Sequence, residues 1–239
     1  MTARLAAVAA AHARILARRR TALLLLALLP LAFYGALYRH SPHAVTVGGV
    51  ASAFSAGGAA IFSMLSARAV DQRLTLAGYR PAVLIAGRLI VLEAAGLGIS
   101  LLTATVMIAG TGPAHPGDVF AGVILTGLVA VPLGLALGAL LPRELEAVLI
   151  LIGIVGIQIT ASPDTTIATL LPFHAARQLL DGAVATPAAF WPQLAAAVAY
   201  SAALLGITWA AWRQRAAVHR SPGALAAAAH ADSPARVRE

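Results

Sequence analysis

Six long apolar runs, with seventeen arginines distributed unevenly among the segments around them, constrain the fold of this chain more than any other feature. A helix rises 1.5 Å per residue, so about 20 apolar residues cross the hydrocarbon core of a bilayer. Each run is therefore predicted to form a transmembrane helix. The six spans cover residues 21–38, 45–65, 89–110, 119–141, 145–161 and 190–212.

The composition places the whole chain among integral membrane proteins. Of its 239 residues 60% are hydrophobic and 11% charged, which is outside the range of ordinary soluble domains. We expect an all-α fold with a single transmembrane domain over residues 1–215 and a disordered cytoplasmic tail over residues 216–239. The net charge is +8, but the basic residues flank the spans and form no separate polar domain. We therefore expect no nucleic-acid partner.

The basic residues, which are all arginine, define a membrane orientation. Only Arg39 and Arg177 fall on one side of the six predicted spans, and the other fifteen fall on the opposite side. Short loops rich in positive charge stay in the cytoplasm, so both termini are predicted to be cytoplasmic. Alanine-rich usage without lysine is typical of a GC-rich bacterial genome, so we expect a multi-pass protein of the bacterial plasma (inner) membrane.

Before the first span, the sequence has the pattern of an amphipathic helix. Arg4, Arg14 and Arg18 share an arc of about 80° on a helical wheel, and four apolar residues share a separate arc of about 100°. Those four are Leu5, Val8, Ile15 and Leu16. The pattern predicts a helix in the cytoplasmic interface, although a frayed basic leader that only orients the first span is an alternative.

Two connections carry more pattern than ordinary loops. The one after the second span reads as a short helix, a break at Gly78 and a second helix that starts near Pro81, because glycine ends helices and proline suits their first turn. The connection between the fifth and sixth spans is too apolar for a solvated loop. It is predicted to form two short helices interrupted at Pro172, and because the fifth span is short, one or both dip back into the membrane from outside.

Catalytic chemistry has no visible place in the chain. A P-loop needs a lysine beside the β- and γ-phosphates, and the chain contains none. The histidines are scattered and form no H-E-x-x-H pattern, and no G-x-S-x-G is present. We therefore expect no catalytic residue, no metal site and no directly bound cofactor. Glu93 is the one intramembrane charge singled out, either as a functional group or as a shallow side chain that is salt-bridged or reaches the interface.

The order and spacing of these parts, from Arg4 to Arg215, resemble the permease subunits of bacterial type-2 ATP-binding-cassette (ABC) transporters. The segment 68–88, with AVDQRLTLAGYRPAVLIAGR, is similar to the coupling-helix loop of that family. The segment 170–182, LLPFHAARQLLDG, is similar to its re-entrant extracellular helices. The chain departs from the pattern in the coupling loop, where Asp71 is the only acid.

The resemblance implies a function and a set of partners. Two copies, or one copy and a related permease, would form the pore, and two ABC ATPase subunits that bind ATP and Mg²⁺ would dock on the loops. The implied cargo is a hydrophobic or amphipathic molecule such as a drug, a lipid or a peptide, and the implied direction is export. Docking is expected at Asp71, Arg73, Leu74 and Tyr79. The substrate path is expected at Phe54, Gln158 and Phe173.

Two other classes of membrane protein stay open. A proton-coupled secondary transporter needs titratable groups near the middle of the bilayer, and Glu93 is the only candidate in the chain. A membrane anchor or immunity-type protein that transports nothing requires no chemistry at all.

Overall fold

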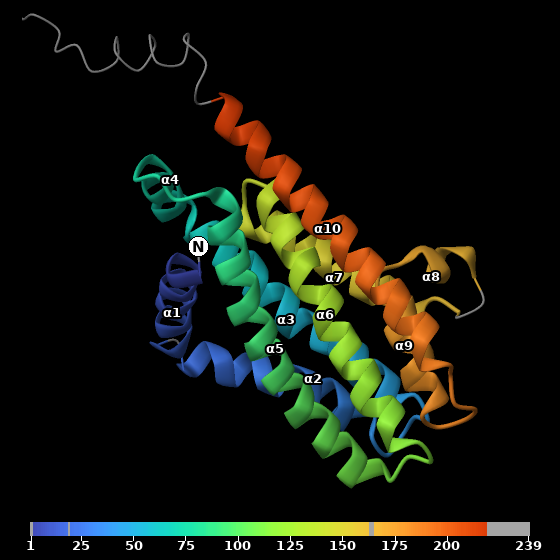
Figure 1. Cartoon of the computed structure of the whole chain (residues 1–239). Coiled ribbons are helices and arrows are strands. Elements are labelled where there is room, and N and C mark those ends of the chain that lie inside the picture. Colours follow the sequence, from blue (N-terminus) through green and yellow to red (C-terminus); the bar gives the residue numbers. More distant parts are fainter. Residues whose placement is uncertain (1, 19, 163–164, 219–239) are drawn as a thin grey trace, which may run out of the picture.

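The computed structural model describes residues 2–18, 20–162 and 165–218, which form ten helices and no strand (Figure 1). This confirms the predicted all-α fold class. Residues 219–239 of the predicted tail lie outside the described part, whereas residues 216–218 continue the last helix. The helices are α1 (Thr2–Arg18), α2 (Arg20–Leu37), α3 (Ala44–Ser66), α4 (Arg68–Leu76), α5 (Pro81–Thr111), α6 (Pro116–Leu140), α7 (Glu144–Thr160), α8 (Thr166–Leu170), α9 (His174–Gly182) and α10 (Phe190–Val218).

Within the described residues, four helices are long and apolar enough to cross a membrane, namely α3, α5, α6 and α10. They coincide with the predicted second, third, fourth and sixth spans. Helices also form at the other two predicted spans, where the apolar stretch among the described side chains of α2 is Leu24–Leu37 and α7 has 17 residues. The third predicted span is part of a longer helix, because α5 already begins at Pro81.

Helices α3 and α6 form the centre of the bundle, and α5 and α10 lie at its periphery (Figure 1). Of the apolar stretches that are long enough to span, 78% of α3 and 83% of α6 are buried, against 28% of α5 and 22% of α10. A helix that is apolar on every side is stable only when other helices or lipid surround it. Helix α6 is of this kind, and the neighbouring helices α3, α5, α9 and α10 pack around it.

Close contact between α3 and α6 depends on glycine. A Cβ atom added at Gly134 would lie 2.2 Å from the carbonyl oxygen of Gly57, and one added at Gly138 would lie 2.8 Å from Cβ of Met64. Both distances are too short for real side chains, so only hydrogen fits at these positions. The G-x-x-x-G spacing of Gly134 and Gly138 therefore serves packing between two helices of the same chain.

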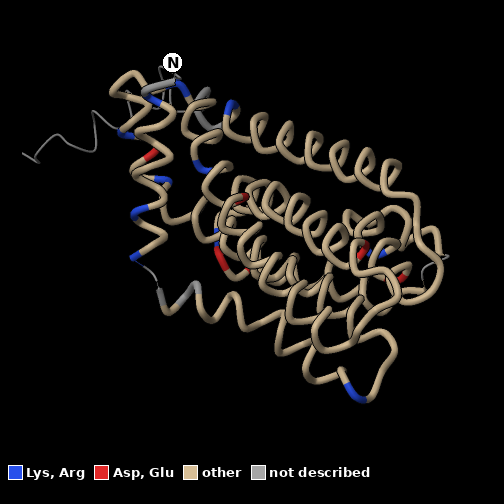
Figure 2. The backbone as a smooth tube through the Cα atoms, turned by 60° about the horizontal axis from the view of Figure 1, so that its bottom comes forward, with Lys and Arg blue, Asp and Glu red and all other residues tan. Residues whose placement is uncertain are grey.

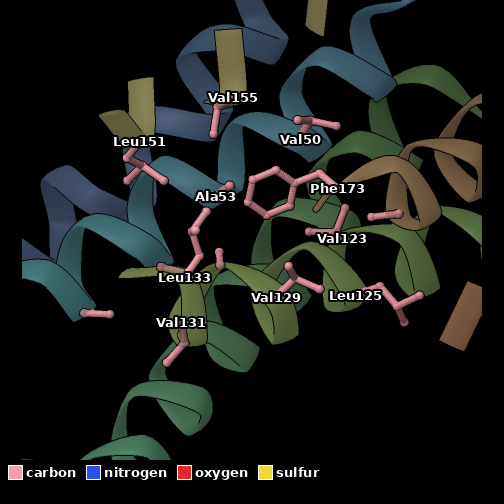
Figure 3. Close-up of a cluster of buried hydrophobic side chains, with 14 of the residues drawn as sticks. Val50, Ala53, Val123, Leu125, Val129, Val131, Leu133, Leu151, Val155 and Phe173 are labelled. Atoms are coloured by element: carbon pink, nitrogen blue, oxygen red, sulfur yellow. The ribbon is translucent and has the colours of Figure 1, made fainter. Parts of the chain in front are cut away.

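The core between α3, α6 and α7 is a layer of branched aliphatic side chains around one aromatic ring (Figure 3). The ring belongs to Phe173, which precedes α9 and has no exposed surface. Its neighbours in the close-up include Val50 of α3, Val123 of α6 and Val155 of α7. Burying a side chain of this size contributes about 1.5–3 kcal/mol relative to exposure to water, so Phe173 fastens the connection after α7 to the bundle.

The peripheral helices expose large apolar side chains along much of their length. The most exposed on α5 and α10 are Ile90 (51%), Leu102 (49%), Trp191 (75%) and Val198 (50%). Contiguous apolar surface of this extent is rare on monomeric soluble proteins. Together with the four long apolar helices, it indicates a membrane protein.

Both patterned connections fold into short helices. Gly78 adopts φ +85° directly after α4, and Pro81 occupies the first turn of α5, as predicted. Pro172 separates α8 from α9, also as predicted, and the hydroxyl oxygen of Thr165 caps α8 by accepting from the amide of Ala168 at 3.3 Å. The chain from 2 to 18 is helical too, so the predicted N-terminal helix is present as α1.

Candidate functional site

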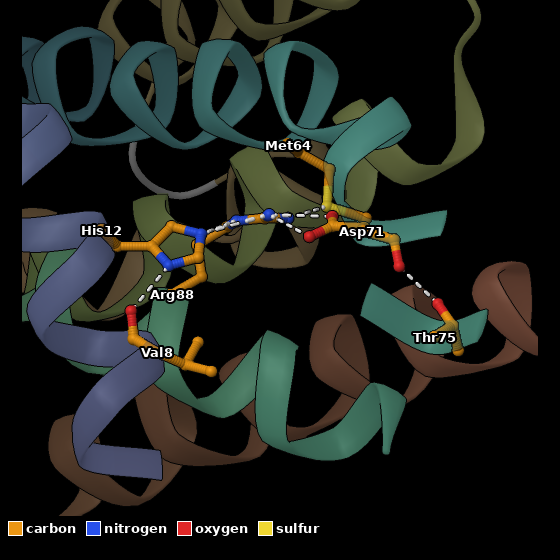
Figure 4. A network of polar contacts seen from close by, with 6 residues as sticks. All are labelled: Val8, His12, Met64, Asp71, Thr75 and Arg88. Carbon is orange, nitrogen blue, oxygen red and sulfur yellow. Dashed lines mark hydrogen bonds and ion pairs between the residues drawn. The ribbon is translucent and has the colours of Figure 1, made fainter. Parts of the chain in front are cut away.

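The most distinctive polar group in the described residues is a buried ion pair between α4 and α5 (Figure 4). Nη2 of Arg88 lies 2.8 Å and 3.0 Å from the two carboxylate oxygens of Asp71. Arg88 is 1% exposed and Asp71 is 4% exposed. Moving both charges out of water costs several kcal/mol each, and only good geometry with further hydrogen bonds offsets this cost.

Two further partners complete the surroundings of the guanidinium group. Nη1 of Arg88 lies 3.0 Å from Sδ of Met64 on α3. Nε and Nη2 of Arg88 lie 3.4 Å and 3.3 Å from Nε2 of His12 on α1. Thr75 adds a hydrogen bond from its hydroxyl to the backbone oxygen of Asp71. We call these five residues, His12, Met64, Asp71, Thr75 and Arg88, the α4 junction.

His12 joins α1 to the α4 junction through both ring nitrogens. Its Nδ1 lies 3.0 Å from the backbone oxygen of Val8, which has no proton to give, so Nδ1 is the donor of that bond. Nε2 faces the guanidinium group of Arg88. The imidazole thus ties α1 to α5.

Apolar packing surrounds the junction and brings α1 against the first turns of α5. Val8, Val83 and Leu84 form a small buried cluster, on which Leu74 and Tyr79 pack. A Cβ atom at Gly87 would meet Cγ1 of Val8 at 2.7 Å, so the two helices are as close as a hydrogen allows. On the outside of this cluster, the Arg4 guanidinium group lies over the Tyr79 ring, 5.7 Å from its centroid.

The start of α4 is fastened to a third place in the bundle through Arg68. Its Nη2 donates to the carbonyl oxygen of Gly138 at 2.7 Å and to that of Leu141, and its Nη1 donates to that of Pro142 at 3.2 Å. These are carbonyls at the end of α6, which lack partners within the helix and carry the negative end of its dipole. A cation there caps α6 and joins it to α4.

The four residues predicted for docking fall into three environments. Asp71 is buried in the α4 junction, so its side chain offers no contact to another protein. Leu74 and Tyr79 are half-buried against the small apolar cluster. Arg73 is exposed, and the most exposed apolar residue of α4 is Leu76, at 90%. The solvent-facing surface of α4 therefore includes Arg73 and Leu76 and excludes Asp71.

A pocket of about 390 Å³ lies beside the α4 junction. Its walls come from α1 to α5 and are mainly apolar, and its polar lining includes Asp71, Arg88 and His12. Sequence patterns did not indicate this pocket, because its walls come from segments between residues 7 and 92 that meet only in three dimensions.

The three residues predicted for a substrate path do not line this pocket. Gln158 and Phe173 have no exposed surface, and neither side-chain polar atom of Gln158 has a partner among the described residues. Phe54 is half-buried and stacks on Phe33, with ring centroids 5.7 Å apart. Glu93 is also half-buried on α5 and lies outside both the junction and the pocket lining.

A second polar cluster joins α7, α9 and α3 at the opposite end of the bundle. Nη1 of Arg177 donates to the carbonyl oxygens of Gln158 at 2.5 Å and Ala161 at 2.7 Å, at the end of α7. Nε of Arg177 lies 3.5 Å from the Asp181 carboxylate, which accepts from the Thr46 hydroxyl at 2.6 Å. The charged side chains of α9 are thus partly turned inward, because a buried helix end needs these donors.

Nearby, burial lowers the pKa of His174, and the Arg177 guanidinium group lowers it further. Among the described residues, no group of three or more histidine, aspartate and glutamate side chains is placed to hold a metal ion. In sequence comparisons, neither a protein-family model nor a curated protein matches the chain. The functional assignment therefore rests on the patterns and the geometry described above.

Proposed function

We propose that the chain is the transmembrane permease subunit of an ABC transporter and that it exports a hydrophobic or amphipathic substrate. The observation that carries the proposal is the way α4 is mounted. It is a short helix with an exposed apolar tip, and it is fastened to α6 through Arg68, to α5 through Arg88 and to α1 through His12. A force applied to such a helix moves several membrane helices together.

In this proposal, separate ATPase subunits bind and hydrolyse ATP with Mg²⁺ and push on α4. The chain pairs with a second copy or a related permease to form the pore, in the bacterial inner membrane. All six predicted spans cross, with the bilayer thinned locally around the short helices α2 and α7, and α8 and α9 dip into the outer leaflet. The buried Phe173 supports this last point, since it holds α9 against α6 inside the bundle.

The arginine distribution supports cytoplasmic termini. Figure 2 shows the basic residues gathered at the end of the bundle where the N-terminus lies. The exceptions are Arg39, in the connection between α2 and α3, and Arg177, on α9. An ATPase that docks on α4 would therefore meet the chain on its arginine-rich side.

The test is co-purification with candidate ABC ATPases from the same genome. The chain and each candidate are expressed together, extracted in mild detergent and separated by size. We expect co-elution, and we expect Leu76→Asp to reduce it at least tenfold while the thermal unfolding midpoint is unchanged, because Leu76 is almost fully exposed. Val184→Asp is the matched control, since Val184 lies in the connection between α9 and α10, far from α4, and is 43% exposed. Absence of co-elution, or equal loss in both variants, would contradict the proposal.

A proton-coupled secondary transporter is the second candidate function, because Glu93 is a half-buried acid within a predicted span. Transport assays in inverted vesicles separate the two. If the proton gradient alone drives uptake and Glu93→Gln abolishes it, the secondary transporter is correct. If uptake needs ATP and the ATPase and tolerates Glu93→Gln, the ABC permease is correct. A non-transporting anchor protein would show neither activity.

A further inference from the structure

We infer that the pocket between α1 and the bundle binds one anionic phospholipid of the cytoplasmic leaflet, with an acyl chain inside and the headgroup at the arginines of α1. The inference rests on the chain being a membrane protein with its arginine-rich end in the cytoplasm. It does not depend on the transport proposal, and it concerns a different surface from the exposed tip of α4.

The pocket has the size and lining of a site for an amphiphile. Its volume of about 390 Å³ falls in the range of roughly 300–1,000 Å³ that is typical of small-ligand pockets, which are mostly apolar with a few polar groups. Its apolar walls include Leu16 of α1, Leu26 of α2 and Val91 of α5. Two large apolar residues in its lining stay strongly exposed, Ile15 at 57% and Phe62 at 43%. The protein leaves about half of the surface of these two side chains uncovered, and an acyl chain would cover it.

The position of the pocket favours a lipid over a soluble ligand. The α3 and α5 side chains in its wall belong to two of the helices that are long enough to cross a membrane. The opposite wall is α1, whose amphipathic pattern is typical of a helix at the membrane surface. A cavity between such a helix and the spans opens toward the region where lipid headgroups and acyl chains meet.

Charge decides which lipid fits. Ala7, Ala11, Arg14 and Arg18 follow one another at intervals of three or four residues, so they form one stripe along α1. The two alanines line the pocket, and both arginines are exposed beside them. There is no acidic residue from position 2 to 37, and Asp71, the only acid in the pocket lining, is neutralised by Arg88. The edge of the pocket is therefore positive and complementary to a phosphate that carries a net negative charge.

Native mass spectrometry of the full chain tests the inference. The protein is purified in mild detergent, stripped of lipid and titrated with phosphatidylglycerol or with phosphatidylcholine of the same acyl chains. We expect one phosphatidylglycerol to bind first and to bind more tightly than phosphatidylcholine. Replacing both arginines, Arg14→Ala with Arg18→Ala, should weaken phosphatidylglycerol binding by about fivefold for each arginine and leave phosphatidylcholine unchanged. Arg143→Ala is the charge control, because Arg143 is exposed outside the pocket lining.

A photoactivatable phosphatidylglycerol with a diazirine in its acyl chain gives the location. In vesicles of phosphatidylglycerol and phosphatidylcholine, we expect labelled peptides from α1 and from the second half of α3. Ala11→Trp should fill the pocket and reduce this labelling several-fold, whereas Ala10→Trp, on the exposed face of α1, should not. If Ala11→Trp fails to fold, the arginine variant decides, since Arg14 and Arg18 are exposed.

Three results would overturn the inference. The first is labelling spread evenly over the exposed apolar surfaces of α5 and α10 with no enrichment at α1, which would mean ordinary annular lipid. The second is equal affinity for phosphatidylglycerol and phosphatidylcholine in the unmodified chain and in the arginine variant. A soluble anion as the true ligand would also contradict the proposed occupant. In that case inorganic phosphate would displace phosphatidylglycerol in the mass-spectrometry titration, and the acyl-chain labelling in vesicles would stay unchanged.

Discussion

The Arg88 side chain is the residue on which most contacts at the arginine-rich end converge. Removing one partner of a buried ion pair leaves an uncompensated charge and costs about 3–5 kcal/mol, whereas an apolar pair of similar volume is often neutral or stabilising. We therefore predict that Asp71→Asn and Arg88→Met each lower the free energy of unfolding by several kcal/mol. The double variant Asp71→Leu with Arg88→Met should recover most of the loss, measured by unfolding in increasing SDS.

The exposed pair Arg143 and Glu146 is the control for this experiment. Its nitrogen and oxygen are 3.7 Å apart, and the Arg143 side chain is 81% exposed. Exposed pairs of this kind contribute about 0–1 kcal/mol. Arg143→Met should therefore change the free energy of unfolding by less than about 1 kcal/mol. A buried pair whose single variants behave like Arg143→Met would show that water reaches Asp71 and Arg88.

Two glycines in different helices should respond in opposite directions to the same substitution. Gly134→Ala places a Cβ 2.2 Å from the Gly57 carbonyl oxygen, so α3 and α6 must move apart, and we expect a loss of about 1–3 kcal/mol. Gly153→Ala meets nothing within 4 Å and removes a flexible residue from α7, so it should leave stability unchanged or raise it by up to about 1 kcal/mol. Thermal unfolding of the two variants in the same detergent compares them directly.

Among the elements, α7 and α9 depend on each other through Arg177. Without its guanidinium group, two carbonyl oxygens at the end of α7 and the Asp181 carboxylate lose their donor. We predict that Arg177→Met increases hydrogen exchange of the amides of α9 and of the last turn of α7 at least tenfold, with little change in α5. Arg39→Met serves as the control, because Arg39 is exposed in the same half of the molecule. Equal exchange in both variants would contradict this role.

Patterns in the sequence predict elements well in this chain and contacts poorly. Apolar runs predict the helices because membrane thickness imposes a minimum length, and Gly78 and Pro81 predict the break before α5 because their backbone preferences are local. The pair of Asp71 and Arg88 is different. Asp71 and Arg88 are 17 positions apart in the sequence, and His12 precedes Arg88 by 76 positions. Local backbone preferences do not predict that these distant side chains come into contact.

Contacts between residues far apart in the sequence also explain why residues predicted to lie at the docking surface or along the substrate path are buried. Asp71 and Arg177 look like solvated charges because polar loops usually carry them. Their actual role is to satisfy groups that folding would otherwise leave without a partner. Phe173 follows a proline in an irregular connection, so its position in the core depends on how α9 folds back on α6, which helical periodicity does not describe.

At the scale of the whole molecule, the absence of cysteine makes the orientation directly measurable. Single variants His40→Cys, in the α2–α3 connection, and Ala77→Cys, after α4, place one thiol at each end of the bundle on exposed residues. We predict that a membrane-impermeant maleimide added to intact cells, with outer-membrane access provided, labels His40→Cys only. Both variants should react after the cells are opened. Labelling of Ala77→Cys in intact cells would reverse the proposed topology.

The contact between α1 and α5 also has a consequence for the order of synthesis. His12 leaves the ribosome 76 residues before Arg88 does. At about 5–20 residues per second, α1 must exist for roughly 4–15 s before its partner is made. During this interval Val8 of α1 lacks the Val83 and Leu84 side chains that later pack on it. The amphipathic pattern of α1 would suit it to a membrane surface until then.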